Sequence, residues 1–284
     1  MTTETKGRDV RHLMLWALLA VSFVVCYFSF FEWLVYQYER QDSYYSHGYF
    51  IPFVTALLVY LKRKDIMRSE FGSDRAGLLV IGAALLIRIF GVLGDVNFIS
   101  GFSMVLYIIG CSLYLLGRQV TGIIIYRLLY LVFMLPLPGE LINIIALPFK
   151  SAATSIALWG MDILDVPYVR EGFIVHLPTA TFVVGTPCNG MRSLISFASL
   201  AALMLYMFRT SLWKKVVFLA VIPPLALLLN GVRVFLLLWI AHRFGQDAAT
   251  PESYLHDGSG MLVFFVGFLV IVLLVRKINE KKKS

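Results

Sequence analysis

Three side chains suited to acyl-transfer chemistry stand at the edges of long apolar runs in this sequence. Cys188 lies in "VGTPCNGMRSLISF", Arg233 lies in "LLLNGVRVFLLLW", and His256 opens "HDGSGMLVFF". A cysteine nucleophile needs a base to activate it, and the oxyanion that it generates needs a hydrogen-bond donor or a cation. A thiol, an imidazole and a guanidinium fill these roles if the fold brings them together.

The sequence around Cys188 predicts a helix that begins directly after the thiol. The residues before it are small and polar, and from Leu194 the chain is almost continuously apolar. Asn189 and Gly190 are typical of the tight turn that starts such a helix. Because a helix N-terminus stabilises negative charge, we expect the pKa of Cys188 to be lowered.

Arg233 lies within an apolar run, where a charge is costly and usually faces a protein interior or a water-filled cavity. If this helix enters the membrane near Val216, Arg233 follows 17 residues later, or roughly 25 Å along the axis. That depth is near the opposite boundary, at the level expected for Cys188. Asn230 precedes Arg233 by three residues and shares its face, and His256 reaches the same boundary at the start of the last apolar run.

The sequence also offers competitors for each role. His47, His176 and His242 are alternative bases, and Arg192, one turn after Cys188, is an alternative cation. Spacing alone does not rank them. The His and Cys residues lack the spacing of a metal site, and no P-loop, dinucleotide fingerprint or G-x-S-x-G motif is present. We therefore expect neither a metal nor a cofactor.

The composition indicates an all-α polytopic membrane protein. The chain has 284 residues, of which 59% are hydrophobic and 15% charged, and its mean hydropathy is +0.80. A soluble domain has about 25% charged residues, so this much apolar surface requires a bilayer. The net charge of +8 comes from residues in short loops and near both ends. This distribution favours membrane orientation over nucleic-acid binding.

Eight apolar runs have the composition of membrane spans. Their approximate bounds are 13–35, 47–62, 76–95, 98–117, 119–136, 189–208, 214–242 and 259–276. Every second connection between them is basic, which predicts that both termini are cytoplasmic. Cys188, Arg233 and His256 would then lie at the extracytoplasmic face of the cell membrane.

Two further elements are expected in the long segment before Cys188. Residues 139–165 have helical apolar spacing with Lys150 and Asp162, and we interpret them as an amphipathic helix at the outer interface. Residues 167–187 have strand-like composition and predict a short β-hairpin that leads to Cys188. The whole chain, 1–284, is expected to form a single integral membrane domain.

Several segments together resemble the exosortase/archaeosortase family. They are "YSHGYFIP" (45–52), "FMLPLPGELI" (133–142), "VPYVREGFIVHLP" (166–178), "CNGMRSL" (188–194), "NGVR" (230–233) and "HDGSG" (256–260). Each segment alone is weak, but their order along the chain is specific. The sequence departs from the family's motif at Asn189, where many members have Ser.

The resemblance implies a transpeptidase that processes exported proteins with a C-terminal motif, a transmembrane helix and a basic tail. It assigns the catalytic roles to Cys188, Arg233 and His256. Supporting residues are expected at Arg192, Asn230, His47 and Asn189. Cys188 would form a thioester with the substrate, at a sorting motif such as Pro-Glu-Pro. An acceptor at the cell surface would resolve the thioester, and water in its place would give hydrolysis. Membrane lipids are the other expected partners.

Two other functions fit the same sequence. The first is a transporter or channel, with an anion path lined by Arg88, Arg127, Arg192 and Arg233. The second is a non-catalytic component of an exopolysaccharide export system. A pore or a scaffold has no need of the Cys188 thiol, so the chemistry of that residue distinguishes both from a transpeptidase.

Overall fold

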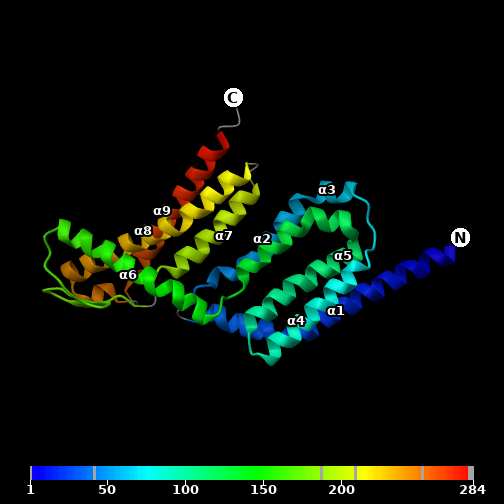
Figure 1. Cartoon of the computed structure of the whole chain (residues 1–284), viewed down its shortest axis with the longest axis horizontal. Coiled ribbons are helices and arrows are strands. Elements are labelled where there is room, and N and C mark those ends of the chain that lie inside the picture. The colour runs from blue at the N-terminus through cyan, green and yellow to red at the C-terminus, as the bar shows by residue number, and fades with distance from the viewer. Residues whose placement is uncertain (1, 41–42, 186–187, 208–209, 251–252, 281–284) are drawn as a thin grey trace. The chain divides into compact units, whose positions relative to one another are not determined.

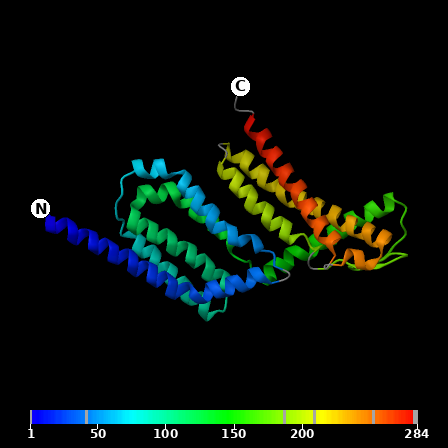
Figure 2. The same ribbon diagram turned by 180° about the vertical axis from the view of Figure 1, so that it is seen from behind.

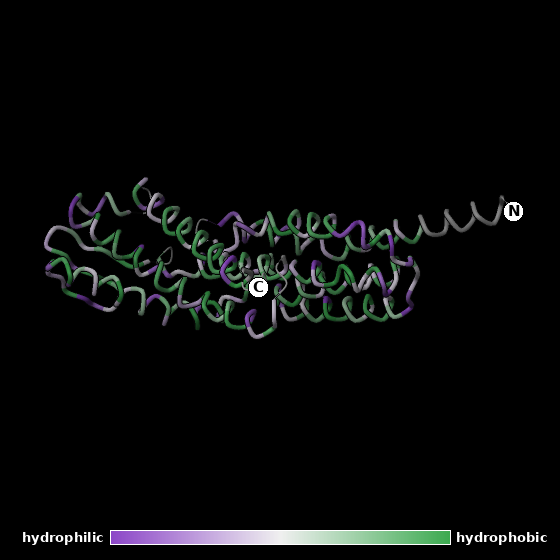
Figure 3. The backbone as a smooth tube through the Cα atoms, turned by 90° about the horizontal axis from the view of Figure 1, so that it is seen from above, coloured by the Kyte–Doolittle hydropathy of each residue, from purple (hydrophilic) through white to green (hydrophobic). Residues whose placement is uncertain are grey.

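A computed structural model describes residues 2–40, 43–185, 188–207, 210–250 and 253–280. These residues are mainly helical and fall into two compact units, Met1–Pro138 and Gly139–Ser284. Figure 1 shows the elements of each unit, and Figure 2 shows them from behind. Apolar residues dominate the helices, whereas hydrophilic residues gather toward helix ends and connections (Figure 3).

Among the described residues, six helices are long and apolar enough to cross a membrane. They are Met14–Glu39, Ala76–Leu93, Asn97–Met134, Gly139–Ile163, Leu212–Phe244 and Gln246–Ile278. Two shorter apolar helices, Ser46–Leu61 and Met191–Tyr206, accompany them. The chain is therefore a multi-pass helical membrane protein, as its composition predicted.

The first unit consists of helices and short helical turns. Its elements are α1 (Thr2–Glu39), η1 (Ser46–Phe50), α2 (Ile51–Leu61), α3 (Arg63–Arg68), α4 (Ala76–Leu93), α5 (Asn97–Leu129) and η2 (Tyr130–Met134). Glycines let α4 and α5 approach closely, as is common between membrane helices. A Cβ on Gly77 would lie 2.4 Å from the backbone nitrogen of Tyr114. A Cβ on Gly91 would lie 2.6 Å from the hydroxyl of Ser100.

Helix α5 reverses its direction at Gly117. This residue has φ 85° and ψ 174°, which no helix contains and which L side chains rarely adopt. The hydroxyls of Ser112 and Thr121 lie 2.9 Å apart. In a straight helix, nine residues would separate them by roughly 13 Å. The two arms therefore fold back on each other, close to where the sequence predicted a boundary between the runs 98–117 and 119–136.

Arg88 of α4 is buried, and within the described ranges no carboxylate pairs with it. Its guanidinium donates hydrogen bonds to the carbonyl of Cys26 and to the hydroxyls of Ser29 and Ser100. The ring of Tyr27 lies 5.6 Å from the guanidinium carbon. Neutral acceptors and an aromatic face thus accommodate Arg88 as a buried structural residue, which makes a role in an anion path unnecessary.

The second unit carries the residues singled out from the sequence around Cys188. It contains α6 (Gly139–Ile163), β1 (Val169–Glu171), β2 (Ile174–His176), β3 (Thr181–Val183), α7 (Met191–Met207), α8 (Leu212–Phe244), η4 (Gln246–Ala249) and α9 (Tyr254–Glu280). Helices α7, α8 and α9 run side by side (Figures 1 and 2). The expected hairpin is instead a three-stranded antiparallel sheet of order β1-β2-β3, so β3 is an edge strand.

Close helix contacts at glycines fix the register of the second unit. A Cβ on Gly231 of α8 would lie 2.6 Å from the side chain of Ile156 on α6. A Cβ on Gly267 of α9 would lie 2.2 Å from the ring of Phe197 on α7. The predicted helix over 139–165 is present as α6 and has an apolar stretch long enough to span. Its placement at the interface, and the single domain over 1–284, stay predictions.

Candidate active site

Cys188 lies between the edge strand β3 and the start of α7. Its side chain is only 3% exposed and belongs to the apolar core of the second unit, together with Val184 and Val234. The chain turns sharply at Gly190, which has φ +77°. A Cβ there would lie 2.9 Å from the Asn230 amide, so this turn requires glycine.

The two asparagines proposed to support the site hold the backbone around Cys188. The Asn189 side chain accepts a hydrogen bond from the Met191 backbone N–H, 3.0 Å away, and so caps the start of α7. The Asn230 amide donates to the carbonyl oxygen of Cys188 at 2.8 Å. Asn189 therefore supports the turn in the way that a serine hydroxyl also could.

The imidazole of His256 is the meeting point of the site. Its Nε2 lies 3.8 Å from Cys188 Sγ and 3.4 Å from Arg233 Nη2. A guanidinium has only donors, so Nε2 must be the acceptor, and the neutral ring then carries its proton on Nδ1. Nδ1 lies 3.9 Å from a carboxylate oxygen of Asp257. The Nε2 lone pair that accepts from Arg233 is thus also the one that the thiol approaches.

Arg233 reaches His256 by lying against the start of α9. A Cβ on Gly260 would come within 3.2 Å of the guanidinium carbon and of Nη2. By contrast, a Cβ on Gly258 would meet nothing within 4 Å. The motif "HDGSG" therefore contributes a base, His256, at its first position. At its last position, Gly260 has no side chain, which leaves room for the guanidinium against the backbone.

The alternative candidates lie elsewhere or act less directly. His176 packs in the sheet, with Nδ1 3.2 Å from the Thr181 hydroxyl. The Thr179 hydroxyl donates to the backbone carbonyl of His242 at 2.9 Å. The side chain of Arg192 is exposed on the first turn of α7. His47 belongs to the first unit, where its ring stacks on Tyr45, and its supporting role stays a prediction.

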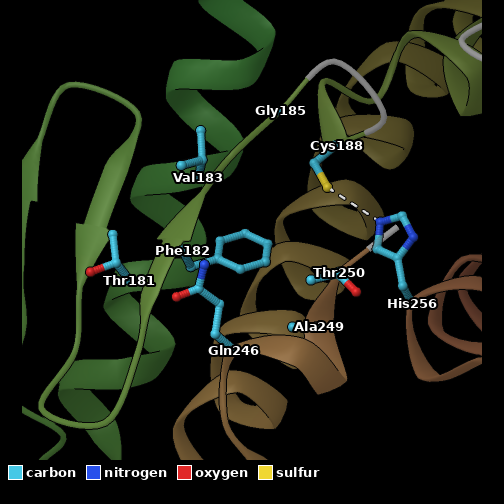
Figure 4. Close-up of a pocket in the computed structure, with 9 residues that line it drawn as sticks. All are labelled: Thr181, Phe182, Val183, Gly185, Cys188, Gln246, Ala249, Thr250 and His256. Carbon is cyan, nitrogen blue, oxygen red and sulfur yellow. Dashed lines mark hydrogen bonds between the residues drawn. The ribbon is translucent and has the colours of Figure 1, made fainter. Parts of the chain in front are cut away.

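A cavity of about 180 Å³ opens next to Cys188 and His256 (Figure 4). It is lined by Thr181, Phe182, Val183, Gly185, Cys188, Gln246, Ala249, Thr250 and His256. The strand β3 forms one wall, and η4 with Thr250 forms another. The wall formed by η4 was not expected from the sequence, because the segment 244–250 is a short polar connection without any motif.

Lys150 of α6 is a second cation near the thiol that sequence reasoning did not place there. Its ammonium lies 4.0 Å from the centre of the Phe173 ring, and its charge acts on Cys188. The available signal was a lysine inside an otherwise apolar helical pattern. Within the described ranges, no three His, Cys, Asp or Glu side chains gather as a metal site would need.

The pKa of Cys188 is raised, contrary to the lowering expected at a helix N-terminus. Burial raises the pKa of the thiol, and this outweighs the charges of Arg233 and Lys150 and a backbone hydrogen bond with Gly185, which lower it. Removal from water disfavours the thiolate more strongly than these groups stabilise it. The free protein therefore holds a neutral thiol beside its base, instead of the activated thiolate that the helix terminus suggested.

The fold defines a multi-pass helical membrane protein, and the site is a buried thiol–imidazole–guanidinium cluster. The family model described as transmembrane exosortase matches residues 38–273. This range covers most of the chain, and the chain belongs to the transmembrane exosortase family. Comparisons with curated proteins and with solved structures give no match.

The raised pKa of Cys188 gives a first testable prediction. In a variant whose only cysteine is Cys188, we expect the pH midpoint of iodoacetamide labelling to lie above the roughly 8.5 of a free thiol. Arg233→Gln should raise the midpoint further, because it removes the positive charge that most favours the thiolate. Lys150→Gln should raise it less. A midpoint below that of a free thiol would restore the activated-thiolate interpretation.

Proposed function

We propose that this exosortase-family chain is a membrane-embedded cysteine transpeptidase that cleaves C-terminal sorting signals. The observation that supports this best is the shared contact at His256 Nε2, which a thiol and a guanidinium approach at 3.8 and 3.4 Å. The three residues come from three separate segments of the chain, and Cys188 and His256 line one cavity. Membership of the exosortase family supports sorting-signal proteins as the substrate class.

In the first half of the reaction, Cys188 Sγ attacks the carbonyl carbon of a peptide bond next to the substrate's membrane helix. The thiol proton moves to His256 Nε2 as the carbon–sulfur bond forms. Arg233 leaves the imidazole lone pair and stabilises the oxyanion. When the carbon–nitrogen bond breaks, His256 donates its proton to the leaving amine, and a thioester to Cys188 remains.

In the second half, an acceptor attacks the thioester. For an amine acceptor, His256 removes the proton from the nitrogen, the carbon–sulfur bond breaks, and the thiolate recovers a proton from His256. Water in place of the amine would give hydrolysis instead of transfer. The proposed partners are exported proteins bearing a motif such as Pro-Glu-Pro, a transmembrane helix and a basic tail. The acceptor is a group at the cell surface.

We further propose that the chain crosses the cell membrane eight times, with both termini cytoplasmic and the site outside. The reversal at Gly117 supports two spans within α5, and the short apolar helices supply two more. Helix α6 then lies at the outer interface, because a ninth span would place the termini on opposite sides. The alternation of basic connections favours this arrangement.

The transpeptidase proposal predicts a distinct pattern of losses for single substitutions. The assay follows cleavage of an exported reporter that ends in a Pro-Glu-Pro motif, an apolar helix and a basic tail. Cys188→Ala should abolish cleavage and thioester capture, because no other group can replace the nucleophile. His256→Ala and Arg233→Met should each reduce the rate by roughly 10²–10⁴-fold. His242→Ala, which lies outside the cluster, is the control.

Retention of cleavage by Cys188→Ala would contradict the proposal. A transporter would instead keep its flux in that variant, and an export-system component would tolerate all three losses. Polysaccharide secretion measured in the same strains distinguishes these alternatives.

Gly260 is predicted to be a positioning residue that acts through Arg233. Gly260→Ala places a methyl group against the guanidinium and should reduce reporter cleavage roughly 3- to 30-fold. It should also shift the pH midpoint of Cys188 labelling. A purely structural effect would leave that midpoint unchanged. Gly258→Ala, two residues earlier in the same helix, should change neither. Equal behaviour of the two alanine variants would exclude this role.

The eight-span topology predicts that tags at both ends of the chain are shielded in intact cells. An impermeant reagent should label a cysteine tag at either terminus only after permeabilisation, whereas Cys188 and an introduced Thr179→Cys face outward. Labelling of one terminal tag in intact cells would indicate an odd number of spans. It would make α6 a membrane span.

A further inference from the structure

The edge strand β3 borders the cavity that contains the nucleophile. Thr181, Phe182 and Val183 line this cavity together with Cys188 and His256. Because the sheet order is β1-β2-β3, only one side of β3 is occupied by a neighbouring strand. In Figure 4 the side chains of Cys188, Gln246 and Thr250 lie on the other side of β3, across the cavity.

The hydrogen-bond register identifies which backbone groups of β3 face the cavity. Leu177 and Ala180 exchange backbone hydrogen bonds, and the Val184 N–H donates to Phe173. Val175 pairs with Phe182 midway between these two pairs. In an antiparallel ladder, alternate residues point their N–H and C=O groups toward the same neighbour. Phe182 therefore points toward β2, whereas Thr181 and Val183 point their backbone groups toward the outer edge.

An outer edge of this kind is a template for another extended strand. Main-chain hydrogen bonds to such an edge recognise a peptide by its backbone, and alternate side chains then contact the surrounding walls. An added strand would lie about 4.8 Å from β3. Since Val183, Gly185 and Cys188 line the same cavity, a strand added at this edge would lie beside the thiol.

We propose that the outer edge of β3 binds the extended segment of the substrate that adjoins its membrane helix, as a fourth strand of the sheet. This inference rests on the proposed transpeptidase function and specifies how its substrate is held. The backbone groups of Thr181 and Val183 fix the depth of the segment and present one peptide bond to Cys188. The side-chain amide of Gln246, from the η4 wall, faces the bound segment from across the cavity.

The strand pairing restricts where the substrate can contain proline. Only every second residue of an added strand turns its N–H and C=O toward β3. Proline is therefore tolerated at the alternate positions, as it is on edge strands with the missing N–H facing outward. Recognition would depend on backbone pattern as much as on side-chain identity.

A proline substitution on each edge of the sheet tests the proposal. Val183→Pro removes an N–H from the outer edge of β3 without removing a hydrogen bond to β2, and the Val183 side chain is exposed. We expect reporter cleavage to fall about 10-fold or more through the lost hydrogen bond and the blocked edge. Labelling of Cys188 by iodoacetamide should stay within about twofold of the unsubstituted protein, because the small reagent does not need the strand.

The opposite edge of the sheet supplies the matched control. Ile174 and His176 point toward β1 where they pair with Glu171 and Val169, so Arg170 points its N–H outward on that side. Arg170→Pro should leave cleavage near its original rate. Equal loss in the Val183 and Arg170 variants, or unchanged cleavage by Val183→Pro, would overturn the proposal.

A second experiment changes the substrate and leaves the enzyme intact. In a proline scan through the reporter segment before its apolar helix, we expect cleavage to be lost at alternate positions. A uniform loss, or no loss, would overturn strand addition. Cys188→Ala is measured on the same reporter. If it retains cleavage, the transpeptidase proposal itself fails; if it abolishes cleavage and the scan shows no alternation, only the strand proposal fails.

Discussion

The site in the second unit depends on one nitrogen, Nε2 of His256, which both the Cys188 thiol and the Arg233 guanidinium approach. A thiol can only be activated if His256 Nε2 is free to take its proton, whereas the guanidinium of Arg233 occupies the same lone pair at 3.4 Å. The resting cluster is therefore held in its neutral, unreactive form. An oxyanion on a bound substrate would give Arg233 a better partner and release the base.

Glycines in the surrounding helices and turns allow the close approach that this contact requires. Gly260 makes room for the guanidinium, Gly190 allows the turn that brings Cys188 beside Asn230, and Gly231 lets α8 lie close to α6. Close approach of backbones favours association of helices in lipid, where no hydrophobic force drives it. Among these glycines, Gly260 leaves the space against α9 that the guanidinium of Arg233 occupies.

Much of this arrangement was predictable from periodicity and cost. The apolar runs predicted the helices, because a backbone in lipid must satisfy its own hydrogen bonds. The high free energy of a charged side chain in lipid indicated that Arg233 faces a protein interior. Spacing alone did not decide among four histidines and two arginines, because it fixes only depth along one helix. The resemblance to the exosortase family selected His256 and Arg233, whose side chains lie 3.4 Å apart. The third strand and the walls formed by η4 lacked any signal, since three-residue strands and short polar connections carry no periodicity.

The expected lowering of the Cys188 pKa was wrong because burial outweighs the effect of the helix terminus. A helix N-terminus stabilises a nearby negative charge by about 0.3–1 kcal/mol. Burial can raise the pKa of an acid by several units, and one unit corresponds to about 1.4 kcal/mol. With a side chain only 3% exposed, desolvation wins even with two cations nearby. A thiol kept neutral is a poor target for oxidants and stray electrophiles, which react with the thiolate. For the extracytoplasmic site proposed above, the burial that delays activation would also protect the nucleophile until a substrate binds and His256 accepts the proton.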